Sequence, residues 1–162
     1  MNKQFTFWGI AALGAAFVIG GLLVIWLGLH SRGELQQSLV DEKITGEDPA
    51  ILLTYEGGRA PEGVEVPEVL IDTSGEAHNQ AMLIRMHTLA VTGGKTYTEM
   101  DREDPARATY ITSLTLQNSL HIAHIGLELS LFVIGTGFAF VGLGAGTLVL
   151  GLPLVRKVIA LK

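Results

Sequence analysis

Two long stretches without a charged residue dominate the pattern of hydrophobic and polar positions along the chain. The first runs from Phe5 to Leu29 over 25 residues, and the second from Leu129 to Val155 over 27 residues. A helix that crosses the hydrocarbon core of a bilayer needs about 20 apolar residues. The pattern therefore predicts two transmembrane helices, and it excludes both an ordinary soluble enzyme and a disordered chain.

The first stretch also has features of a secretory signal peptide, because Lys3 gives it a short basic start. The apolar core of a signal peptide is about 7–15 residues long and ends in a small-x-small cleavage site. Here the apolar stretch is longer, and Trp8 and Trp26 lie near its two ends, where indole rings prefer the headgroup region. We therefore expect residues 1–30 to be an uncleaved first transmembrane helix.

Basic residues beside the two stretches predict the orientation. Lysine and arginine are retained on the cytoplasmic side of the membrane. Lys3 precedes the first stretch, and the tail 156–162 after the second contains Arg156, Lys157 and Lys162. We expect a multi-pass protein of the plasma membrane with both termini in the cytoplasm and residues 31–120 outside it.

The segment 31–120 carries nearly all the charge, with seven basic and fifteen acidic side chains and a net charge of −8. Apolar residues at positions 35, 39 and 40 predict that the first helix continues beyond the membrane and stops near Thr45. Prolines and glycines then interrupt residues 47–67. They predict an ordered loop with one short strand pair, formed by Ile51–Tyr55 and Val64–Val66.

Two helix starts and, between them, the start of a short turn are marked beyond this loop. A crossing helix begins at a cap supplied by one of residues 72–74 and ends at Gly93-Gly94, since glycine tolerates a left-handed stop. Thr96–Glu99 then has the form of a capping box. Asp104-Pro105 has the form of an N-cap followed by a first-turn proline, and no breaker separates it from the second span, 121–155.

These elements predict an all-α membrane protein. It has two antiparallel transmembrane helices and, between them, an extracytoplasmic and mostly helical segment. The absence of cysteine means that no disulfide staples this segment.

The run Gly93–Arg107 reads GGKTYTEMDREDPAR. It resembles the GGKTYAE-(hydrophobic)-DREDP-x-R signature of an uncharacterised family of small two-span membrane proteins seen mainly in actinobacteria. The similarity in amino-acid sequence covers residues 70–115. Outside this range the resemblance is limited to the arrangement of the two spans. It implies a fold and a membrane location but no reaction. Some members carry an automatic label as aromatic ring-opening dioxygenases, which are soluble iron proteins and do not fit this chain.

No catalytic motif occurs in the sequence. It contains no cysteine cluster, no phosphate-binding G-x-x-x-x-G-K-[ST], no nucleophile elbow G-x-S-x-G and no zinc-binding H-E-x-x-H. We therefore expect a protein that is not an enzyme.

A polar face at the start of the second span is the strongest candidate for chemistry. His121, His124 and Glu128 are three and four residues apart, so they share one face of a helix. Glu128 is the only charged residue of the predicted span, where a carboxylate is usually paired, solvated or functional. With His30 at the outer end of the first span, these residues form a candidate site for copper or zinc. Ordinary interfacial polarity and contact with a partner subunit are the alternatives.

Small residues recur at a spacing of four within the two spans. Helices in lipid associate by close approach of their backbones, so such stripes are candidate contact faces. The candidates are Ala12, Ala16 and Gly20 in the first span, and Gly142 and Gly146 in the second. The charged residues Asp101, Arg102, Glu103 and Asp104 are either a solvated helix start or a docking surface for a partner.

The function that fits these features is a non-catalytic accessory or structural subunit of a larger integral membrane protein complex. By fold-level analogy, respiratory and monooxygenase assemblies are the first candidates for this complex. The alternative is a metal-handling or redox auxiliary that uses the His/Glu face. A self-associating homo-oligomer is the third interpretation. The expected partners are other membrane proteins and the lipid bilayer, with no nucleic acid.

Overall fold

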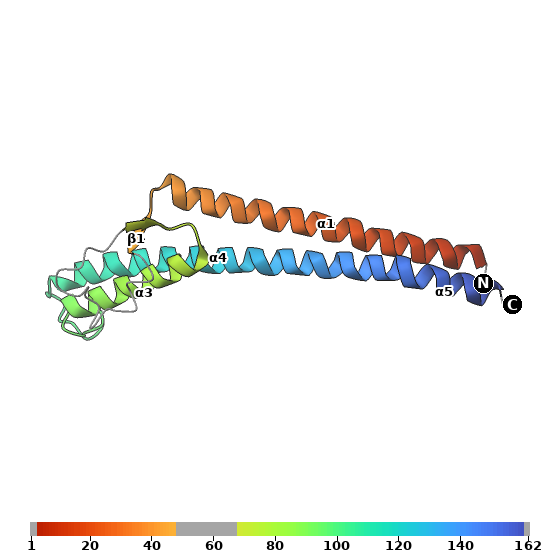
Figure 1. Ribbon diagram of the computed structural model, residues 1–162. Helices are drawn as coiled ribbons and strands as arrows, with labels where there is room; N and C mark the ends of the chain where they lie inside the picture. The colour runs from red at the N-terminus through yellow and green to blue at the C-terminus, as the bar shows by residue number, and fades with distance from the viewer. Residues whose placement is uncertain (1–2, 48–67, 161–162) are drawn as a thin grey trace. The chain divides into compact units, whose positions relative to one another are not determined.

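The computed structural model describes residues 3–47 and 68–160 of the chain (Figure 1). These residues are mostly helical, as the all-α prediction requires. The predicted strand runs within 51–66 lie outside the described residues. The elements are α1 (Lys3–Asp41), β1 (Thr45–Glu47), β2 (Glu68–Leu70), α3 (Ser74–Val91), α4 (Ala106–Gly146), the π-helical η1 (Thr147–Gly151) and α5 (Leu152–Ala160).

The chain divides into two compact units. One, which we call the span unit, combines Met1–Arg32 with Leu129–Lys162, and the other, which we call the α3 unit, is Gly33–Glu128. The α3 unit thus includes residues 121–128, which the sequence placed at the start of the second span. The span unit keeps both charge-free stretches.

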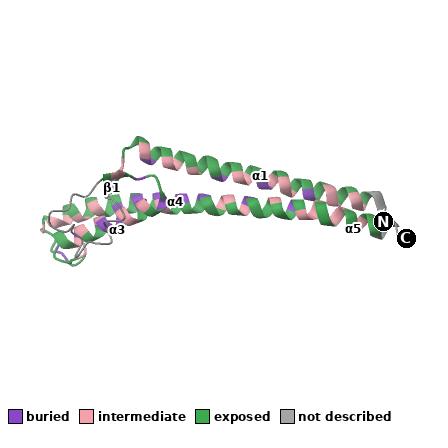
Figure 2. Ribbon diagram, in the orientation of Figure 1, coloured by how far each residue is buried: buried purple, intermediate pink, exposed green. Residues whose placement is uncertain are grey.

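Helices α1 and α4 are each long and apolar enough to cross a membrane. Large apolar side chains such as Phe5, Trp26, Phe132 and Phe138 are exposed along them (Figure 2). Such a surface is unfavourable in water and favourable in hydrocarbon. Because α4 has 41 residues, its length is about 60 Å, or about twice the thickness of a hydrocarbon core.

Glycines seven residues apart build the contact between the two helices of the span unit. Gly14, Gly21 and Gly28 on α1 are buried, and so are Gly137 and Gly144 on α4. A Cβ atom added to Gly21 would lie 2.7 Å from the carbonyl oxygen of Gly137, and one added to Gly144 would lie 2.6 Å from that of Gly14. Only hydrogen fits at these positions, so the two backbones touch.

The order of these contacts shows how the two helices run in the span unit. A Cβ added to Gly14 would meet Gly144 and Leu148, whereas one added to Gly28 would meet Ser130 and Ile134. Residue numbers that rise along α1 therefore meet numbers that fall along α4. The seven-residue spacing of the glycines keeps them on one face over several turns, as in a left-handed helix pair.

The predicted small-residue stripes do not form this contact. A Cβ added to Gly20, Gly142 or Gly146 would meet nothing within 4 Å, and Ala12 and Ala16 are exposed. Gly142 precedes the buried Gly144 by two residues. It therefore lies about 200° around the helix axis from Gly144, on the other side of α4. These stripes do not pack α1 against α4, and their role as partner contacts stays a prediction.

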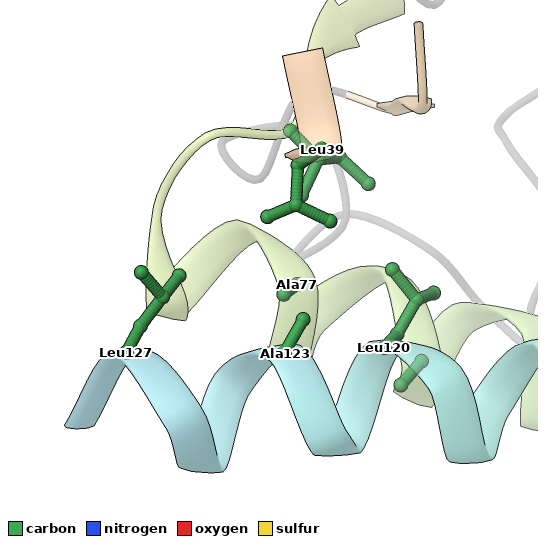
Figure 3. Packing of buried hydrophobic residues seen from close by; sticks show 7 residues of the cluster. Leu39, Ala77, Leu120, Ala123 and Leu127 are labelled. Atoms are coloured by element: carbon green, nitrogen blue, oxygen red, sulfur yellow. The ribbon is translucent and has the colours of Figure 1, made fainter. Parts of the chain in front are cut away.

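The α3 unit has its own small core. Leu39 at the end of α1 packs over α3 and α4, where Ala77 faces Leu120, Ala123 and Leu127 (Figure 3). Alanines at the centre of this contact let the two helices approach closely. Ile71 and Ala81 complete the buried cluster, and β1 pairs with β2 in antiparallel register, with Thr45 opposite Leu70.

Candidate functional site

The start of α3 is held by a capping box, which places the side chains of its first two turns. Thr73 is the N-cap, and its hydroxyl accepts a hydrogen bond from the amide of Glu76. The Glu76 carboxylate accepts the amides of Asp72 and Thr73, each at 3.1 Å. Burial raises the pKa of Glu76, but the hydrogen bonds from Asp72 and Thr73 outweigh it and leave the pKa below its usual value. This end of α3 is therefore fixed, and Ser74 and His78 follow it.

A polar cluster joins the first turns of α3 to α4 within the α3 unit. The Ser74 hydroxyl donates to Oε1 of Glu128 at 2.5 Å and lies 2.8 Å from Nδ1 of His124. The same nitrogen lies 3.1 Å from the carbonyl oxygen of Ser74. A carbonyl oxygen only accepts, so Nδ1 of His124 carries the proton and donates it. Ser74 thus bridges His124 and Glu128.

Three imidazole rings lie together beside this bridge. The ring of His78 on α3 is centred 5.0 Å from that of His124 and 6.0 Å from that of His121. His78 is exposed, and His121 and His124 are half-buried. We call His78, His121 and His124 the histidine cluster. It is open to solvent on one side.

The sequence identified part of this site and missed part of it. It placed His121, His124 and Glu128 on one face of α4, and the structure adds Ser74 and His78 from α3. One feature of the sequence could have identified Ser74 and His78. They are four residues apart, so they share a face of α3, and this face lies beside the buried alanines of that helix. His30 belongs to the span unit, where its ring stacks on Trp26 with centres 5.4 Å apart.

In the part of the chain that the structure describes, no three histidine, aspartate or glutamate side chains are positioned, as they stand, to hold a metal ion. The copper or zinc site therefore stays a prediction. The cluster offers imidazole nitrogens at its exposed edge and a carboxylate behind Ser74.

The signature run begins with a turn that stops α3. Gly93 and Gly94 have φ angles of 62° and 81°, which only glycine adopts without strain. The amide of Gly94 donates to the carbonyl of Leu89 at 2.7 Å. The predicted left-handed stop at Gly93-Gly94 is thus confirmed.

The rest of the signature folds on itself through side-chain contacts. The hydroxyl and the amide of Thr96 donate to Oε2 of Glu99 at 2.6 and 2.7 Å, and these bonds lower the pKa of Glu99. The Arg107 guanidinium lies 3.8 Å above the centre of the Tyr97 ring and donates to the carbonyl of Met100 at 2.8 Å. Thr96, Tyr97, Glu99 and Arg107 of this run therefore have structural roles in the loop.

The acidic end of the signature divides into a cap and an exposed part. Oδ1 of Asp104 accepts the amide of Ala106 at 2.9 Å, so Asp104 caps α4 as predicted. Asp101, Arg102 and Glu103 are exposed. Their side chains make no hydrogen bond or ion pair with the described residues. Among residues 101–104, these three therefore present exposed side chains that a partner could meet.

Comparisons of the chain with protein families, with curated proteins and with solved structures found no match.

Proposed function

We propose that this chain is a non-catalytic accessory subunit of a larger integral membrane protein complex. The observation that carries the proposal is the outward glycine stripe of α4. Gly142 and Gly146 leave bare backbone on the side of α4 away from the buried Gly144. In lipid, bare backbone is where another helix can pack closely. Because the contact within the chain uses other glycines, this face is available to another subunit.

A second face on α1 supports the same function. Gly20 lines an apolar groove of about 260 Å³. The other lining residues are Leu13, Ala16, Phe17 and Phe140. Two of the predicted contact residues, Ala16 and Gly20, thus lie in a hollow that the apolar side chains of a neighbouring helix would fill.

The α3 unit provides the third element of the proposal. Its signature loop is folded by its own contacts, while Asp101, Arg102 and Glu103 are left exposed. We assign these three side chains to docking on the extracytoplasmic part of the complex. Respiratory and monooxygenase assemblies are the first candidates for the complex, by fold-level analogy.

The proposed location is the plasma membrane, crossed in antiparallel directions by α1 and α4. Lys3 and the pair Arg156-Lys157 favour cytoplasmic termini. A phosphatase reporter that is active only outside the cytoplasm should therefore be active when inserted at Gly57-Gly58 and inactive when fused after Lys162. The opposite pattern of activities would reverse the proposed orientation.

The subunit proposal predicts the size of the assembly. The tagged wild-type chain, extracted from its native membrane in mild detergent, should migrate on a native gel at a mass several times that of a 17.3 kDa chain in a micelle. Mass spectrometry of that band should identify the same other membrane proteins in each preparation. Tagging one of those proteins should then recover this chain. A band that contains this chain alone would contradict the proposal, and a band of several copies would favour self-association.

A further inference from the structure

The histidine cluster has a feature that the subunit function does not use. Nδ1 of His124 donates to the Ser74 carbonyl at 3.1 Å, which leaves the lone pair of a neutral imidazole on Nε2. Metal-binding histidines typically donate their other ring nitrogen to a carbonyl or a carboxylate, because that bond fixes the tautomer and the ring orientation. His124 is already held in this way without a metal.

The separation of the His78 and His124 rings matches that of two ligands on a shared ion, and the His121 ring lies about 1 Å farther out. A tetrahedral zinc ion with nitrogen ligands at about 2.0–2.1 Å places the centres of two imidazole rings about 5 Å apart. The observed separations from His78 are 5.0 Å to His124 and 6.0 Å to His121. As they stand, no three potential ligand side chains among the described residues are placed to hold an ion, so binding requires a change of ring orientation. Rotation about the Cβ–Cγ bond of histidine is soft, so the rings of His78 and His121 can turn toward Nε2 of His124 while the bond to Ser74 keeps the His124 ring in place.

The charge around the cluster also favours a cation. Glu128 is linked to His124 through Ser74, whose hydroxyl donates to the carboxylate at 2.5 Å. A carboxylate behind a ligating histidine helps to fix the ring and offsets the charge of a bound divalent ion. The exposure of His78 gives an ion a path from the solvent.

We propose that His78, His121 and His124 bind one divalent transition-metal ion of the zinc and copper class, with Ser74 and Glu128 orienting His124. Neutral imidazoles suit these ions, whereas magnesium and calcium prefer oxygen ligands. The site differs from the one suggested by the sequence, because His78 replaces His30 and Glu128 acts behind a ligand. The proposal does not depend on the accessory function, since it concerns the α3 unit of the purified chain.

Zinc alone is the probe that tests this site. The full chain, purified in detergent and stripped with a chelator, should take up one equivalent of Zn²⁺ in a calorimetric titration. His78→Gln should weaken binding at least about tenfold, as expected for the loss of a ligand or its support. His78→Cys should retain binding, because a thiolate also ligates zinc. His87→Gln is the matched control, since His87 lies on the same helix outside the cluster.

Three outcomes of this titration overturn the proposal. The first is a wild type that binds only weakly and at several sites, which is an adventitious ion only. The second is His78→Gln with the affinity of the wild type. The third is an equal loss of affinity in His87→Gln. Circular dichroism of each variant checks that the helices are intact, and because His78 is exposed we expect its replacement to leave the fold unchanged.

Discussion

Gly21→Leu should separate α1 from α4 in the span unit. A Cβ at this position would lie 2.7 Å from the Gly137 carbonyl oxygen and 2.8 Å from the amide nitrogen of Val141. Both are backbone atoms, which no side-chain rotation can move away. Overpacking a tight contact costs about 1–3 kcal/mol even where side chains can adjust, so we expect a loss of about 3 kcal/mol in the stability of the pair.

The chain offers a control one residue away. Gly20→Leu adds the same side chain to the same helix, at a position where a Cβ would meet nothing within 4 Å. Since the chain has no cysteine, dyes can be placed on single cysteines at Gly9 and Val149, both exposed. Energy transfer between the dyes during an SDS titration should fall at a lower SDS fraction for Gly21→Leu than for Gly20→Leu. Equal midpoints would show that the close contact at Gly21 does not hold the helices together.

The helix boundaries were the most predictable part of the fold, because they depend on local chemistry. The crossing helix begins after Thr73, one of the three caps proposed, and stops at Gly93-Gly94. Helix α1 continues beyond the charge-free stretch to Asp41, and α4 begins beside its predicted cap, Asp104. Capping boxes, glycine stops and first-turn prolines act within a few residues, so a single sequence displays them.

The contact between α1 and α4 was not predicted, because small residues recur in these helices at two different spacings, four residues and seven residues. A spacing of four draws attention to Gly142 and Gly146, while the contact uses Gly137 and Gly144, which are seven apart. Seven residues are nearly two helical turns, so this spacing also keeps one face. Which face meets the partner helix depends on packing across the pair, and no property of one helix alone decides it.

The candidate site was half predictable for a similar reason. His121 and His124 share a face of one helix, which the spacing of the sequence shows directly. Ser74 and His78 come from another helix, about 50 residues earlier in the chain. Their approach depends on how α3 packs on α4 through Ala77 and Ala123. A one-dimensional pattern contains no such information.

The central claim is that the two glycine faces of α4 have different tasks: Gly137 and Gly144 hold the chain together, and Gly142 and Gly146 hold it to a partner. The double variant Gly142→Leu, Gly146→Leu tests the claim, because bulky side chains push a neighbouring helix away. Ala145→Leu is the control, since it adds bulk at an exposed position about 80° around the helix from the middle of the Gly142–Gly146 stripe.

The most direct measurement is the fraction of tagged chain recovered in the large native complex, with the SDS midpoint of each variant measured alongside. We predict that the double variant leaves the SDS midpoint unchanged and lowers the recovered fraction at least about tenfold, which corresponds to about 1.4 kcal/mol of lost contact. Ala145→Leu should keep both values. Full recovery of the complex by the double variant would contradict the claim that the outward glycine stripe binds a partner.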